Sequence, residues 1–117
     1  MVDIEKIKKE IVEALKPLDP DRIILFGSYA KNSYNENSDI DLYVVTSDEF
    51  VPRNWRENSD IYVKFSKNLR EIRKRVSIDL IVHTKGMYKK FIDFNKPFAN
   101  EILKGQVLWR KDLKLNG

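Results

Sequence analysis

Two aspartates, Asp39 and Asp41, stand one residue apart and follow a Gly27-Ser28 pair along the chain. The segment from Ser38 to Val45 alternates its side chains as a β-strand does, so both carboxylates project from one face of the predicted strand. Adjacent carboxylates repel each other unless they share a cation, and hard divalent ions such as Mg²⁺ take oxygen ligands of this kind. The pair therefore predicts a divalent-metal site.

The glycine-serine pair is the second candidate for chemistry. The apolar run Arg22–Phe26 predicts a buried strand that leads directly into Gly27-Ser28, and a short helix is expected near residues 28–33. A glycine in a tight strand-to-helix turn lets the backbone approach a ligand, and the free N–H groups at a helix N-terminus bind phosphate. Each motif alone is typical of ordinary turns and exposed strand ends, but together they favour phosphoryl or nucleotidyl transfer.

A third acid, Asp79, lies within the alternating segment Ser77–His83. Burial of an unpaired carboxylate is costly, so Asp79 is expected at an active edge of the sheet or beside a cation. The preceding helix gives the chain room to return and pair this strand with the one that carries Asp39 and Asp41, where three carboxylates would converge. The alternative for Asp79 is a capping or edge-strand acid. His83 shares its face but lies too far along the strand for the same metal shell.

These motifs resemble those of a known family. The runs Gly27-Ser28-Tyr29-Ala30-Lys31 and Ser38-Asp39-Ile40-Asp41-Leu42 look like the signature of DNA polymerase β-like nucleotidyltransferases, in particular the minimal one-domain members called MNT proteins. The segment around Asp79, and a tail from Pro97 to Trp109 that is similar to the family's closing helix, glycine and short strand, extend the resemblance over nearly the whole chain.

The resemblance implies a palm-like fold and transfer of a nucleoside monophosphate, AMP from ATP, to a hydroxyl acceptor. It implies that Asp39, Asp41 and Asp79 are the catalytic residues. These carboxylates are expected to bind two Mg²⁺ ions. One ion would activate the attacking hydroxyl and the other would hold the triphosphate.

The nucleotide, ATP or another nucleoside triphosphate, is expected to bind through its phosphates to Gly27, Ser28 and Lys31. Ser28 as a plain helix N-cap and Lys31 as a solvated lysine are the alternatives. Lys31-Asn32 departs from the Arg-Gly that many family members carry at this position. Lysine keeps the positive charge but loses the forked geometry of arginine.

The 117-residue chain is expected to form a single nucleotidyltransferase domain over residues 1–117, because its length suffices for one core. Its 42% hydrophobic and 34% charged content is ordinary for a soluble protein. The absence of cysteine excludes disulfides and zinc-thiolate sites and fits the cytoplasm. No apolar run approaches a transmembrane span and no signal peptide is evident. The net charge of +4 suits nucleotide phosphates or an acidic partner but decides little.

Hydrophobic spacing predicts an α/β (α+β) fold, with a small, mixed, twisted sheet and helices mainly on one face. A long polar loop is expected over Ser47–Asn58, with two exposed aromatics, Phe50 and Trp55. The expected helices are Asp3–Lys16, Asp60–Val76, Thr84–Phe94 and a segment from Pro97 to Gly105, and the expected strands are Arg22–Phe26, Asp39–Thr46, Ser77–His83 and Gln106–Arg110.

A polymerase is disfavoured because nothing in the chain could hold a template, and transfer to a small molecule would need a second domain or a partner. The resemblance implies a protein acceptor. The resemblance implies a small helical HEPN partner, which some enzymes of this kind adenylylate as the antitoxin of a toxin–antitoxin pair. Trp55 is predicted to contact such a partner.

Two interpretations from other classes stay open. The first is a non-enzymatic antitoxin that acts by contact and keeps a residual nucleotide pocket, although retention of all three aspartates argues against it. The second is nucleic-acid binding, for which the only support is the net charge and a basic helix face made of Lys67, Arg70, Lys74 and Arg75. Homo-oligomer formation is left open.

Overall fold

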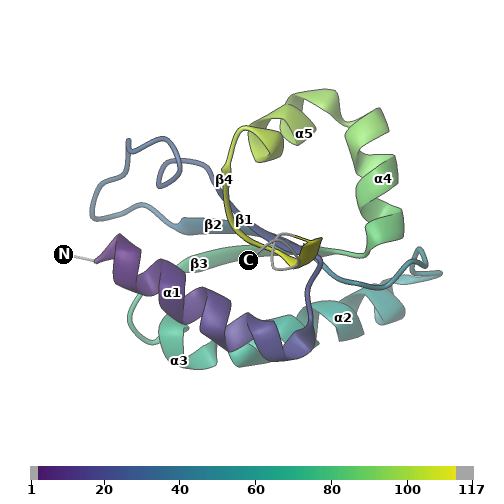
Figure 1. Cartoon of the computed structure of the whole chain (residues 1–117), viewed down its shortest axis with the longest axis horizontal. Coiled ribbons are helices and arrows are strands. Elements are labelled where there is room, and N and C mark those ends of the chain that lie inside the picture. The colour runs from purple at the N-terminus through teal and green to yellow at the C-terminus, as the bar shows by residue number, and fades with distance from the viewer. Residues whose placement is uncertain (1–2, 113–117) are drawn as a thin grey trace.

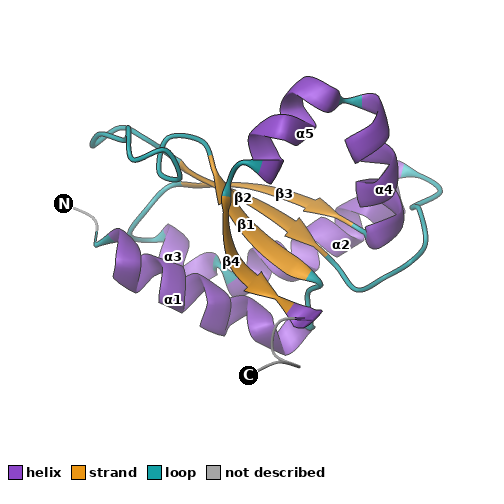
Figure 2. Ribbon diagram, turned by 45° about the horizontal axis from the view of Figure 1, so that its top comes forward, coloured by secondary structure: helices purple, strands orange, loops and turns teal. Residues whose placement is uncertain are grey.

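The computed structural model describes residues 3–112, which form a four-stranded sheet with helices on both faces (Figure 1, Figure 2). The helices are α1 (Ile4–Leu15), α2 (Trp55–Asn68), α3 (Arg70–Arg73), α4 (Lys85–Phe94) and α5 (Lys96–Leu103). The strands are β1 (Arg22–Phe26), β2 (Ile40–Val45), β3 (Ile78–His83) and β4 (Gln106–Arg110). Within these residues no helix is both long and apolar enough to cross a membrane.

The sheet is mixed, with strand order β3-β2-β1-β4. β1 pairs antiparallel with both β2 and β4, whereas β2 and β3 run parallel. A parallel pair needs a long crossover connection, and α2 with α3 supplies it. The predicted mixed α+β fold is confirmed, and each strand lies within one residue of its predicted bounds.

The first face of the sheet is closed by α1, α2 and α3 (Figure 1). α1 begins after Asp3, whose carboxylate accepts a hydrogen bond from the Lys6 N–H at 3.3 Å. Its apolar stripe packs on alternate strand residues because side chains of a strand point to one face at every second position. The fully buried members of this core are Ile11, Leu15, Ile23, Leu25, Ile40, Leu42, Val44, Phe65 and Leu69.

The second face carries α4 and α5 and a smaller core (Figure 1). Thr84 caps α4 as predicted, because its hydroxyl accepts a hydrogen bond from the Met87 N–H at 3.1 Å. Pro97 lies in the first turn of α5, where proline is tolerated, and Gly105 follows the end of the helix. The buried residues of this face are Ile24, Phe26, Tyr43, Val45 and Ile102.

Three local expectations are wrong. The helix predicted as one element over Asp60–Val76 is two helices, α2 and α3, of which the second ends at Arg73. Residues 28–33 form turns and not a helix, because Asn32 adopts a left-handed backbone with φ 61° and the Ser33 N–H closes back on the Ser28 carbonyl at 2.9 Å. The polar loop ends at Asn54 and not at residue 58, since α2 begins at Trp55. Asn54 caps α2 by accepting from the Glu57 N–H at 3.0 Å, a capping signal that is readable in the sequence.

Candidate functional site

Asp41 and Asp79 occupy matching positions on the two parallel strands. Each is the second residue of its strand, and the register of β2 and β3 pairs one directly with the other. Neighbouring strands lie about 4.8 Å apart, so side chains at paired positions are close neighbours. Both side chains belong to the second face, because the residues that flank them on each strand belong to the core of the first face.

Asp39 lies one residue before β2, at the same end of the sheet, and is exposed. The N–H of the next residue, Ile40, donates a hydrogen bond to the Ser77 carbonyl at 2.9 Å, at the point where β2 and β3 begin to pair. The three predicted catalytic acids therefore gather where the two parallel strands begin. We call Asp39, Asp41 and Asp79 the acidic end of the second face.

Gly27 packs directly against Asp41. β1 is antiparallel to β2, so its last residue, Phe26, pairs with Asp41 and Gly27 follows at the acidic end. Gly27 has φ +74°, in the left-handed region that favours glycine, and a Cβ added there would lie 2.1 Å from Oδ2 of Asp41. The sequence predicted that Gly27 would let the backbone approach a ligand. In the structure it lets the backbone approach the carboxylate of a predicted metal ligand.

Negative charge accumulates around Asp41. Burial raises the pKa of its carboxyl above the ordinary value of 3.8, and the nearby charges of Asp79, Asp39 and Glu101 raise it further. All of these causes disfavour the ionised form, and a cation shared between the carboxylates would act in the opposite direction. The acidic end thus has the electrostatic character of a cation site.

The turn after Gly27 presents free backbone donors. The Lys31 N–H donates to the Gly27 carbonyl at 3.1 Å, and the buried Tyr29 ring stacks on Tyr34 with 4.3 Å between ring centroids, which fixes the turn. Among residues 3–112 we find no hydrogen-bond acceptor for the backbone N–H groups of Ser28 and Tyr29. Successive unpaired N–H groups suit an anionic ligand such as phosphate.

Lys31 extends from this turn to α5. Its Nζ lies 2.5 Å from Oε1 of Glu101, so the lysine forms an ion pair and is not a freely solvated side chain. Sequence reasoning missed Glu101, because a single acid on a helix surface has no motif. Only the packing of α5 on β1, through the buried Ile102, brings it close to Asp41.

The acidic end does not form a closed metal cluster. In the part of the chain that the structure describes, no three histidine, cysteine, aspartate or glutamate side chains converge closely enough to hold a metal ion. The donor set nevertheless fits Mg²⁺, since carboxylate oxygens are its preferred protein ligands. Asp39 and Asp79 are exposed, so their side chains can rotate toward Asp41 without disturbing the core.

The opposite end of the second face is aromatic and packed. Tyr43 is fully buried, its hydroxyl lies 2.7 Å from Nδ1 of His83, and its ring contacts Tyr88 and Phe91. We call Tyr43, His83, Tyr88 and Phe91 the aromatic end. His83 therefore belongs to the packing of the aromatic end.

The loop between β2 and α2 lies at the aromatic end. It leaves β2 after Val45, about 13 Å along the strand from Asp41 at 3.3 Å per residue. The Thr84 hydroxyl donates to the Phe50 carbonyl at 2.5 Å and the Lys85 N–H donates to the Asp48 carbonyl, which ties the loop to the start of α4. A partner bound there would not cover the acidic end unless it were large.

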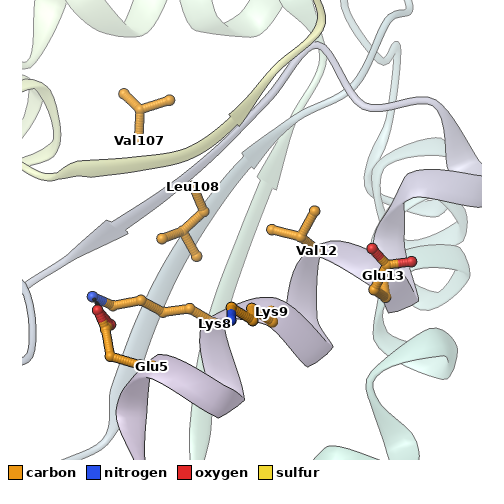
Figure 3. A pocket seen from close by; sticks show the side chains of 7 residues that line it. All are labelled: Glu5, Lys8, Lys9, Val12, Glu13, Val107 and Leu108. Atoms are coloured by element: carbon orange, nitrogen blue, oxygen red, sulfur yellow. Dashed lines mark hydrogen bonds and ion pairs between the residues drawn. The ribbon is translucent and has the colours of Figure 1, made fainter. Parts of the chain in front are cut away.

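A groove of about 550 Å³ lies between α1 and β4 (Figure 3). Figure 3 shows Leu108 of β4 pointing toward Lys8 and Val12 of α1, whereas Val107, the next residue along the strand, points away from α1 at the rim of the groove. Its lining combines this apolar floor with charged α1 side chains and includes none of the acidic-end residues. The groove is therefore separate from the candidate active site.

Comparison with known proteins identifies the family. The sequence matches the nucleotidyltransferase domain family over residues 4–104, which includes the Gly27 turn and all three aspartates. The chain belongs to this family. The family match confirms the prediction, made from the motifs, that the protein is an enzyme that catalyses nucleotidyl transfer.

Two relatives from Methanocaldococcus jannaschii, both provisionally assigned as protein adenylyltransferases, resemble the nucleotidyltransferase over nearly their whole length. MJ0604 is 35% identical over 109 residues, which cover 90% of this chain and 97% of the relative. MJ0141 is 29% identical over 99 residues, which cover 85% of this chain and 94% of the relative.

Solved structures share its fold at lower identity. A provisionally assigned nucleotidyltransferase from Sulfolobus solfataricus aligns with a TM-score of 0.60 at 18% identity, over 93% of this chain and 81% of that one. A toxin–antitoxin complex with AMP-PNP aligns with a TM-score of 0.57 at 18% identity, over 92% of this chain and 76% of that one. A mutant of the toxin–antitoxin MntA-HpeT aligns at 0.54 and 16% identity, over 92% and 75%.

Proposed function

We propose that this nucleotidyltransferase transfers AMP from ATP to a hydroxyl group of a partner protein in the cytoplasm, with Mg²⁺ bound at the acidic end. The observation that carries the proposal is the register that pairs Asp41 with Asp79 beside the glycine turn at Gly27. This arrangement places carboxylates and free backbone N–H groups at one end of the sheet, as a site for a metal-bound triphosphate requires.

Asp39, Asp41 and Asp79 would hold the metal. When bound, divalent ions would supply activation of the acceptor hydroxyl and neutralisation of the charge on the leaving pyrophosphate. The three residues fit this role because the structure leaves Asp41 among uncompensated negative charges. Asp41 is the member fixed most firmly, since it lies between β1 and β3 and against Gly27.

The phosphate side of the site would be the turn after β1. The N–H groups of Ser28 and Tyr29 would donate to phosphate oxygens, and Lys31 would add positive charge. In the reaction the acceptor oxygen forms a bond to the α-phosphorus of ATP, the bond from that phosphorus to the bridging oxygen breaks, and pyrophosphate leaves.

A protein acceptor is supported by the relatives. Both archaeal relatives are named as protein adenylyltransferases, and two structural neighbours are toxin–antitoxin proteins, one of them with AMP-PNP. The MntA-HpeT mutant carries two aspartate-to-glutamate changes two positions apart, which is the spacing of Asp39 and Asp41 here. We therefore propose a small helical protein of the HEPN type as the partner and acceptor.

The proposal is tested by transfer of label from α-phosphate-labelled ATP to a co-purified partner. Asp41→Asn keeps the shape of the side chain but removes a charge, so transfer should fall by several orders of magnitude while partner binding survives. Asp60→Asn is the matched control, because Asp60 is an exposed aspartate on α2 and its loss should not change transfer.

An antitoxin that acts by contact alone predicts the reverse pattern. In that case Asp41→Asn would still neutralise the partner and no label would be transferred by the wild type. Transfer by Asp41→Asn at the wild-type rate would overturn the proposed function.

The nucleic-acid interpretation gains nothing from the structure. Arg75 is paired with Glu10 at 2.6 Å, and Lys74 is paired with Glu71 at 3.1 Å. These acids neutralise half of the predicted basic face, which leaves little continuous positive charge for a phosphate backbone.

A further inference from the structure

We propose that Glu101 is a positioning residue for the nucleotide: it holds Lys31 by an ion pair in the absence of nucleotide and releases Lys31 to the triphosphate on binding. The inference rests on the proposed function, because it assumes that the acidic end binds a nucleoside triphosphate. Its starting point is the 2.5 Å separation of Lys31 Nζ and Glu101 Oε1, which joins the turn after β1 to α5.

Glu101 is the fixed partner of the pair. Its neighbours on α5, Ala99 and Ile102, are 2% and 1% exposed, and Ile102 belongs to the core of the second face. After α5, Gly105 approaches the Leu25 carbonyl so closely that a Cβ would lie 2.5 Å from that oxygen. These contacts pack α5 against β1 and hold the carboxylate of Glu101 near the acidic end.

Lys31 is the mobile partner. It lies on a turn, and its side chain is 57% exposed, against 33% for Glu101. A lysine ammonium is a compact charge on a flexible stem, so it can exchange one anion for another without a change of backbone. An ion pair this exposed is weak because water screens it, so a multiply charged triphosphate can replace the carboxylate.

The ion pair with Glu101 also determines where Lys31 lies before the nucleotide binds. In the absence of nucleotide, an unpaired ammonium at the same end of the sheet as three carboxylates would be drawn toward them by Coulomb attraction. Pairing with Glu101 keeps Lys31 on the phosphate side of the site, beside the free N–H groups of the turn. The ion pair thus keeps Lys31 close to where the triphosphate would bind. Because the ion pair must break on binding, it lowers the affinity for the nucleotide.

The test is titration of the purified protein with a fluorescent ATP analogue, with the corresponding adenosine analogue as a phosphate-free comparison. Glu101→Gln should bind the ATP analogue about two- to fivefold more tightly, because no ion pair must be broken. Lys31→Met should bind it about tenfold more weakly or worse. Neither substitution should change binding of the adenosine analogue.

The matched control is Glu10→Gln. The Glu10–Arg75 pair has nearly the same exposure and a 2.6 Å separation but joins α1 to the turn after α3 on the first face, away from the acidic end, so its loss should not change ATP binding. In the Lys31→Met background, Glu101→Gln should tighten ATP binding less than it does in the wild type. Equal tightening in both backgrounds would mean that Glu101 merely repels the nucleotide, and would overturn the proposal.

The other outcomes separate this inference from the proposed function. If the wild type binds the ATP analogue and Glu101→Gln binds it equally or more weakly, the role of Glu101 is wrong and the proposed function stands. If the folded wild type binds no ATP analogue with Mg²⁺ present, both are wrong.

Discussion

Asp41 and Tyr43 lie two residues apart on β2 and on the same face of the sheet, yet their surroundings are opposite. Tyr43 is fully buried, hydrogen-bonded to His83 and surrounded by rings of α4, whereas Asp41 is half-buried among acids at the end where α4 does not reach. One face of one strand therefore carries a packed region and a region whose charges are uncompensated. The packed end stabilises the fold, and this stability allows the acidic end to keep carboxylates close together although they repel one another.

The largest effect should come from the packed end. Tyr43→Ala should lower the free energy of unfolding by about 3–5 kcal/mol, because it removes a large buried ring and leaves a cavity. Denaturant unfolding measures the loss. Asp41→Asn should show no such loss under the same conditions. A Tyr43→Ala protein as stable as the wild type would show that the aromatic end does not support the fold.

Two glycines, one at each end, sharpen the contrast. Gly27→Ala forces a side chain into a left-handed backbone and onto the Asp41 carboxylate, so it should cost about 1–3 kcal/mol and also strongly reduce transfer. Gly86→Ala places a Cβ 2.5 Å from the Glu49 carbonyl at the aromatic end, so it should destabilise the protein and leave transfer of the folded fraction intact. Unfolding and label-transfer measurements on both variants test this. Equal loss of transfer would contradict the separation of the two ends.

Trp55 tests whether the aromatic end also carries a docking surface. Its side chain is 77% exposed in the first turn of α2, so it does not fill the core, and partner contact stays a prediction. Trp55→Ala should weaken binding of a partner protein by ~2 kcal/mol while the melting temperature of the isolated protein stays nearly unchanged. Phe65→Ala, at a buried position of the same helix, should do the reverse. Unchanged partner affinity in Trp55→Ala would place the docking surface elsewhere.

The two ends should also respond to pH with opposite sign. Burial lowers the pKa of His83 from its ordinary value of 6.5, so the stability linked to this group is complete above that value and is lost as the pH falls below it. The pKa of Asp41 is raised from 3.8, so the stability linked to this group is present below that pH and decreases as the pH rises above it and the carboxyl ionises.

Thermal melts from about pH 8 to about pH 5 isolate the histidine. His83→Gln should flatten the decrease in melting temperature that the wild type shows over this range. The same decrease in both proteins would mean that His83 does not titrate with folding.

The sequence was sufficient for the strands and for most helix ends. An apolar run located β1, alternation located β2 and β3, and the Thr84 cap and Pro97 located the starts of α4 and α5, because these signals are local. The turn after Gly27 was mistaken for a helix because the left-handed Asn32 depends on how the chain closes back on itself. The start of α2 at Trp55 was missed although the Asn54 cap marks it.

The site was predictable only where motif and topology agree. Two aspartates on one strand and one on the next could be brought together because a parallel crossover fixes which ends meet. Glu101 could not be found this way, since its place beside Lys31 and Asp41 depends on the packing of α5. The contact of Gly27 with Asp41 was missed for the same reason: it forms between strands, not within a motif.

The most direct test of the acidic end is a thermal melt of the wild type and Asp41→Asn, each without ligand and with Mg²⁺ and a non-hydrolysable ATP analogue. A ligand that binds only the folded state raises stability by mass action, by about 2.7 kcal/mol at a hundred times its dissociation constant. We expect a clear rise in melting temperature for the wild type and little or none for Asp41→Asn, which should melt at or above the wild type when no ligand is present. An equal rise in both proteins, or none in the wild type, would contradict a metal-nucleotide site built on Asp41.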